Sequence, residues 1–188
     1  MPDERVSAML YRTAILADEM VHKLDSETLL LVSAHYEKCL EISAREKHLY
    51  PYSVYIEVVK ELYLRSGDRS CVYPLIEVLK PWISPDFYKG SALEDSWKKT
   101  SHQKSVFNNI LRLLVFLSNQ EETWKQECIF FVDTYESYAM MDSETFHEIV
   151  LLLPEKKDYL ELIYARSCEA GISDVLDKKF DKYESTTI

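Results

Sequence analysis

Glycine is scarce in this sequence, with only 3 residues among 188. Gly67, Gly90 and Gly171 stand far apart along the chain. A Walker-type loop or a dinucleotide fingerprint needs several glycines within a few residues, because the backbone must approach the phosphates closely. The sequence therefore argues against a nucleotide-binding α/β enzyme.

Long apolar runs and paired cysteines are also lacking. No run approaches the ~18 residues of a membrane span, and the N-terminal residues 1–5 are polar and acidic. The four cysteines, Cys39, Cys71, Cys128 and Cys168, have no CxxC spacing. We interpret them as reduced thiols in a core, and expect an intracellular protein without a signal peptide or a membrane span.

Apolar residues recur at spacings of three and four, which predicts helices along nearly the whole chain. The expected helices are 3–24, 26–48, 53–66, one from about 70, one through 110–117, and then 119–138, 142–153, 156–170 and 175–183. Residues Cys128–Val132 have strand-like composition, but their helical neighbours favour a helix. We find no repeat of 34 or 40 residues, so only a degenerate form of helical repeat is compatible with the sequence.

Local signals set the expected helix ends. They are Asp25 and Asp142 as N-caps, Gly67 as a left-handed C-cap, Ser91 with Glu94 and Asn119 with Glu122 as capping boxes, and Gly171 as the end of a helix. Prolines and serines interrupt the pattern at about 81–101. We therefore expect one all-α domain over 1–188, a compact antiparallel array of eight or nine helices. The irregular segment separates a half of four helices from a half of four or five.

Three patterns were considered as metal sites. Glu19-x-x-His22 and Glu144-x-x-His147 have the spacing of di-iron ligands, but the apolar stripes of their helices place Glu19, His22 and Glu144 on the outer faces. His35 and Cys39 lie four apart and offer two zinc ligands, without the paired spacing that completes a structural zinc site. We expect no cofactor, and His35 and Cys39 remain the alternative for a metal-dependent enzyme or a zinc-linked assembly factor.

Charge is distributed unevenly. Residues 121–188 contain 7 basic and 16 acidic residues, a balance of −9, whereas 61–120 have a balance of +2. An acidic third repels a phosphate backbone and attracts a basic partner surface. Direct nucleic-acid binding is therefore disfavoured. The basic middle segment with Lys98, Lys99 and Lys104 keeps a nucleic-acid-associated subunit as an alternative function.

Aromatic residues gather in the irregular segment as Trp82, Phe87, Tyr88 and Trp97, beside Lys98 and Lys99. Two interpretations stay open. The rings pack as a core between the two helical halves, or the six residues form a docking surface with aromatic anchors and a charged rim.

Together these observations favour a binding function over a catalytic one. The prediction is a protein–protein interaction module, an adaptor or scaffold subunit of an intracellular complex, that holds a partner helix or peptide in a groove between helices. No sequence constellation marks a catalytic residue, so we expect no enzyme. The partner surface is expected to be basic.

Overall fold

The computed structural model describes residues 20–47, 51–94 and 97–184, with side chains described up to residue 170 except at 97 and 98. Every regular element in these ranges is a helix, which confirms the all-α prediction. The chain divides into two compact units, Met1–Pro81 and Trp82–Ile188, and the boundary falls at the start of the irregular segment. The predicted helix 3–24 lies outside the described residues up to position 19.

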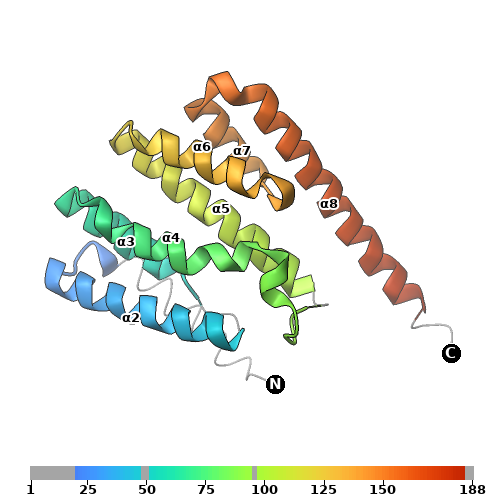
Figure 1. The fold of residues 1–188 in the computed structure, drawn as a ribbon, viewed down its shortest axis with the longest axis horizontal. Coiled ribbons are helices and arrows are strands. Elements are labelled where there is room, and N and C mark those ends of the chain that lie inside the picture. The colour runs from blue at the N-terminus through green and yellow to red at the C-terminus, as the bar shows by residue number, and fades with distance from the viewer. Residues whose placement is uncertain (1–19, 48–50, 95–96, 185–188) are drawn as a thin grey trace. The chain divides into compact units, whose positions relative to one another are not determined.

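The first unit contains α2 (Ser26–Glu46), α3 (Ser53–Ser66), the 3₁₀ turn η1 (Arg69–Cys71) and α4 (Tyr73–Leu79). Helices α2 and α3 lie side by side (Figure 1), and α4 contacts both of them. Apolar side chains from α2 and α3, with Val21, form a buried cluster. The members of this cluster are Val21, Leu29, Val54, Val58 and Leu62.

Two predicted helix ends in this unit are confirmed. The Asp25 carboxylate accepts a hydrogen bond from the Thr28 backbone N–H at 2.7 Å, as an N-cap does. Gly67 follows α3 with φ +65°, and its N–H donates to the Tyr63 carbonyl at 2.8 Å. This left-handed conformation is the reason that glycine suits the position.

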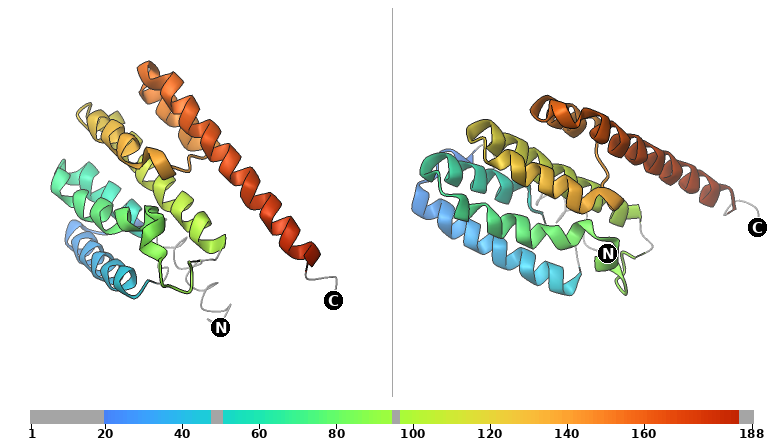
Figure 2. Two further views of the ribbon diagram at one scale, coloured as in Figure 1. Left: turned by 45° about the vertical axis from the view of Figure 1, so that its right-hand side comes forward. Right: turned by 45° about the horizontal axis from the view of Figure 1, so that its top comes forward.

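The second unit contains two 3₁₀ turns, η2 (Lys80–Ile83, whose first residues precede the boundary) and η3 (Pro85–Tyr88), and then α5 (Trp97–Gln120). It continues with α6 (Trp124–Tyr135), η4 (Glu136–Tyr138), α7 (Ser143–Leu152), η5 (Pro154–Lys156) and α8 (Lys157–Glu184). Helix α5 contacts both α6 and α7 (Figures 1 and 2), and its run 110–117 is largely buried, as its all-round apolar character predicts.

The helix count and three boundaries differ from the prediction. The described residues form seven α-helices. The predicted helices 156–170 and 175–183 are one helix, because α8 continues through Gly171 instead of ending there, and most of the predicted helix 3–24 lies outside the described residues. One glycine inside a helix costs only about 1 kcal/mol relative to alanine, and no proline follows it. Likewise α5 continues through Asn119 to Gln120, and α6 begins at Trp124 without a side-chain cap.

The irregular segment is shorter than predicted, since α5 already begins at Trp97. The side chains of Ser91 and Glu94 do make capping-box-like contacts, to the backbone N–H groups of Leu93 at 3.2 Å and Gly90 at 2.7 Å. The backbone there forms a turn and not a helix. Figure 2 shows α8 continuing past the much shorter α7.

The connector between η4 and α7, residues 139–142, is held by polar side chains from two helices. From α5, the Asn108 side chain donates to the Met140 carbonyl at 2.7 Å and accepts from the Asp142 N–H at 2.9 Å. From α8, the Ser167 hydroxyl accepts from the Met141 N–H at 2.9 Å. Backbone groups that leave the helical ladder inside a protein need such partners.

The same connector positions the start of α7. Asp142 accepts a hydrogen bond from the Thr145 N–H at 2.8 Å, which confirms it as the N-cap. The Arg112 guanidinium donates to both Asp142 oxygens at 3.1 Å. Burial by itself would raise the pKa of Asp142, but the bonds from Thr145 and the Arg112 charge together hold that pKa below its usual value.

We expect Asn108→Ala to lower the free energy of unfolding by about 2–3 kcal/mol, because two backbone groups of the connector lose their partner. Asn109→Ala is the matched control, since the Asn109 amide bonds Ser105 within its own helix; its effect should stay within about 0.5 kcal/mol. Urea denaturation followed by circular dichroism measures both. Equal losses in the two variants would contradict the role given to Asn108.

Candidate functional site

The aromatic residues of the irregular segment pack on one another and on His102 of α5. The Trp82 ring lies 5.0 Å from the Phe87 ring and 4.9 Å from the His102 ring, between centroids. The Tyr88 hydroxyl donates to the Trp82 carbonyl at 2.8 Å and lies 3.1 Å from His102 Nδ1. Because that hydroxyl proton points to the carbonyl, Nδ1 carries the proton of the neutral imidazole.

These residues differ in how much of each side chain is exposed to solvent. Trp82 is 1% and Tyr88 0% exposed, and Phe87 is half-buried. The first two rings are therefore buried side chains of the segment, and the role of these residues in partner binding stays a prediction. The side chains of Trp97 and Lys98 lie outside the described residues, and Lys99, on α5, donates to the Glu94 carbonyl.

The predicted metal ligands do not form a cluster in the part of the chain that the structure describes. Cys39 Sγ lies 3.5 Å from His35 Nε2, but no group of three His, Cys, Asp or Glu side chains occurs among the described residues. His22 instead contacts Glu61 at 2.6 Å, and Glu144 pairs with Arg112 at 2.8 Å. Glu19 lies outside the described residues.

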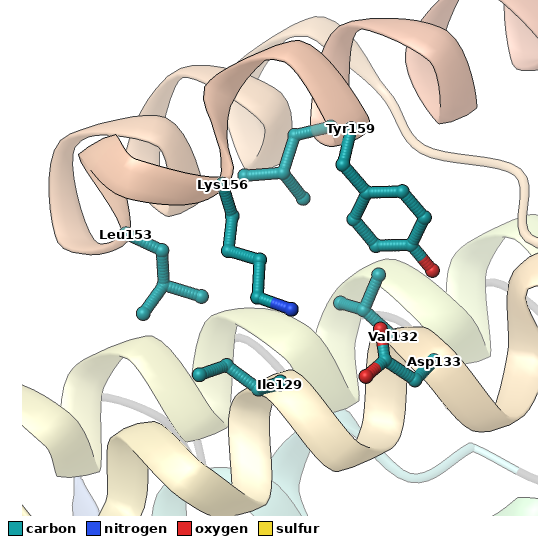
Figure 3. A pocket seen from close by; sticks show the side chains of 7 residues that line it. Ile129, Val132, Asp133, Leu153, Lys156 and Tyr159 are labelled. Atoms are coloured by element: carbon teal, nitrogen blue, oxygen red, sulfur yellow. The ribbon is translucent and has the colours of Figure 1, made fainter.

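A pocket opens in the second unit between α6, η5 and the first turn of α8 (Figure 3). It contains about 170 Å³ of empty space, including its open mouth. Small-molecule sites are usually clefts of roughly 300–1,000 Å³. The lining residues are Ile129, Val132, Asp133, Leu153, Lys156, Tyr159 and Leu160. Because that volume counts open solvent at the mouth, the enclosed part has room for only about one water-sized group. The pocket is therefore too small for a typical small ligand, and its aliphatic lining suits the terminal methyl group of one apolar side chain.

Polar groups surround this aliphatic pocket. In Figure 3, Lys156 and Tyr159 extend toward α6, where Ile129, Val132 and Asp133 face them. The Lys156 ammonium lies 5.7 Å from the centre of the Tyr159 ring, within cation–π distance. Burial raises the pKa of Tyr159, and the neighbouring Asp133 and Glu136 carboxylates raise it further.

The position of Tyr159 is fixed by a short chain of hydrogen bonds. Its hydroxyl donates to Glu136 Oε2 at 3.3 Å. The other oxygen, Glu136 Oε1, accepts from Arg166 at 3.1 Å. Since these bonds join the end of α6 to α8, they fix the two sides of the pocket relative to each other.

The two helices that line the pocket also carry large exposed hydrophobic side chains. Phe130 on α6 is 64% exposed and Leu162 on α8 is 50% exposed. At 100° per residue, Phe130 lies about 60° from Asp133 but about 160° from Val132 around α6. Leu162 lies about 60° from Tyr159 but about 160° from Leu160 around α8. We call the pocket with these two residues the α6/α8 groove.

Sequence reasoning did not find this groove. The signal that the sequence offers is Phe130, an apolar residue that is exposed on α6 while its neighbour Phe131 is buried. The pocket forms only where α6 and α8 lie close together, and no local sequence pattern predicts that these two helices are neighbours.

Comparison of the chain with protein-family models, with curated proteins and with solved structures finds no match. Among the helices that the structure describes, none is both long and apolar enough to cross a membrane.

The half-buried His102 gives the stability of the protein a pH dependence. Burial lowers the pKa of His102 from 6.5 to about 4, so the unfolded chain takes up a proton that the folded chain resists. Stability should therefore fall as the pH drops from above 6.5 toward 4. We expect a loss of about 1–2 kcal/mol from this group, less than the full shift implies, because part of the ring contacts solvent.

The measurement compares urea denaturation at pH 7 and pH 4 for the wild type, His102→Gln and His147→Gln. His147 is an exposed histidine on α7 and serves as the control. Only His102→Gln should reduce the acid sensitivity. An unchanged pH dependence in that variant would refute the role of His102.

The four thiols are all free, but they are not all in a core as predicted. Cys128 is buried, Cys39 and Cys71 are half-buried, and Cys168 is exposed on α8. The sequence misplaced Cys168 because apolar neighbours do not determine which face of a helix a residue occupies. Burial also raises the pKa of Cys128 to about 12, which leaves almost no reactive thiolate there.

We expect a disulfide reagent such as DTNB to label Cys168 first and Cys128 only on unfolding. The Cys168→Ser variant should lose the fast phase of labelling. Rapid labelling of Cys128 in the native protein, identified by peptide mass mapping, would contradict this order.

Proposed function

We propose that this chain is a protein–protein interaction module, an adaptor or scaffold subunit, that binds a helix or extended peptide of another protein in the α6/α8 groove. The observation that carries the proposal is the aliphatic pocket between α6 and α8, two helices that also carry the exposed Phe130 and Leu162. Interface cores combine such a pocket with neighbouring aromatic and aliphatic anchors. The intracellular setting belongs to the same proposal.

The size and surroundings of the pocket support binding in preference to catalysis. Its volume is below that of ordinary substrate clefts. Its rim is already ordered by the bonds among Tyr159, Glu136 and Arg166. A preformed groove lowers the entropy cost of binding, because fewer side chains must be immobilised when the partner arrives.

The test is selection from a phage-displayed library of random peptides long enough for four to five helical turns. We expect peptides enriched on the wild-type protein to lose at least about tenfold in affinity toward Phe130→Glu and toward Leu162→Glu, since each places a carboxylate in the α6/α8 groove. Fluorescence anisotropy with the purified peptides measures the affinities.

Leu151→Glu is the matched control. Leu151 is 70% exposed on α7, so the substitution introduces the same charge at a surface position outside the groove. It should leave affinity within about twofold, and melting curves should confirm that all three variants fold. Failure to enrich any peptide, or enriched peptides that bind Phe130→Glu and Leu162→Glu as the wild type, would overturn the proposal.

A further inference from the structure

We infer that the segment that occupies the α6/α8 groove is a cationic amphipathic peptide, with one aliphatic side chain in the pocket and Lys or Arg residues beside it. This inference rests on the proposed function and names the chemistry of the partner. It is carried by the size of the pocket and by the charges at its mouth.

The pocket determines the central residue of the partner. Ile129, Val132, Leu153 and Leu160 provide an aliphatic lining, and the space of about 170 Å³ includes the open mouth. A polar group placed there would lose water without gaining a hydrogen bond from these four side chains. The pocket therefore favours the aliphatic end of a single residue.

The first charge at the mouth is Asp133, an exposed residue of α6. The Tyr159 hydroxyl lies within hydrogen-bonding reach of both Asp133 and Glu136, and the other Glu136 oxygen accepts from Arg166. A hydrogen bond from a neutral phenol does not neutralise a carboxylate. The negative charge of Asp133 therefore remains at the mouth and can attract a cation of the partner.

Further acidic residues lie where η5 leads into α8. Glu155 and Asp158 are both exposed there, next in sequence to Lys156 and Tyr159 of the pocket. The nearby Lys157 lies 3.6 Å from Glu161, which offsets its charge. With the balance of −9 over residues 121–188, these carboxylates make the mouth attractive to a cationic segment and repellent to an anionic one.

The positive charge of Lys156 opposes this attraction. Its side chain lines the pocket, with the ammonium over the Tyr159 ring. A cationic partner must move this flexible side chain aside against repulsion between like charges. Lys156→Gln should therefore strengthen the binding of a cationic peptide, by about two- to fivefold.

The experiment uses two synthetic amphipathic peptides of four to five helical turns. Both carry the same leucine and alanine face, and their polar faces are all Lys in one and all Glu in the other. Fluorescence anisotropy with the full chain should give at least about tenfold tighter binding of the Lys peptide. That preference should weaken as salt rises from about 50 to about 500 mM, because screening shortens the reach of the rim charges.

Charge reversal locates the effect. The double variant Asp133→Lys with Glu155→Lys should lose about tenfold in affinity for the Lys peptide. The control is Glu27→Lys with Glu41→Lys, which changes the net charge equally at two exposed positions of α2 in the other unit. It should alter the affinity by less than about twofold.

Each unfavourable result has a distinct meaning. If the Lys and Glu peptides bind equally, the cationic assignment is wrong. It is also wrong if library-selected peptides bind and neither synthetic peptide does. In both cases the proposed function stands. Equal losses in the two charge-reversed proteins overturn the assignment of the effect to this mouth. If neither synthetic nor library-selected peptides bind the wild type, the inference and the proposed function fail together.

Discussion

Hydrogen bonds between residues 139–142 and the side chains of Asn108 and Ser167 hold the non-helical connector that leads into α7 of the second unit. At this point the chain leaves a helix inside the unit, and its backbone groups cannot rely on water. One side chain from α5 and one from α8 meet these needs. Because these bonds connect α5 and α8 to the same connector, they fix the start of α7 and the position of α8 relative to α5.

The α6/α8 groove follows from that constraint. Once α8 is placed, Tyr159 and Arg166 reach Glu136 at the end of α6, and a small aliphatic pocket stays open beside them. Phe130 and Leu162 are exposed on the same two helices. In this account the exposed apolar surface provides affinity, and the acidic residues at the mouth select a cationic partner and speed its approach.

The sequence predicted features that local chemistry controls. Asp25, Gly67 and Asp142 occupy the helix ends that their side chains or backbone preferences favour. It failed where a local signal competed with helix propagation, as at Gly171 and Asn119. It also could not identify the groove, because Ile129 and Tyr159 are brought together only by the path of the chain through the connector. Aromatic content alone could not predict that Trp82 and Tyr88 are buried, because content does not determine whether a ring faces the solvent; the binding role of the segment stays a prediction.

Methyl NMR during titration with a bound cationic peptide tests the central claim most directly. The account predicts that the methyl signals of Ile129, Val132, Leu153 and Leu160 shift together as the peptide saturates the protein. Those of Leu30 and Leu31, exposed on α2 of the other unit, should stay in place. Shifts confined to Leu30 and Leu31, or no shifts in the four pocket residues at saturation, would contradict the claim that the α6/α8 groove is the binding site.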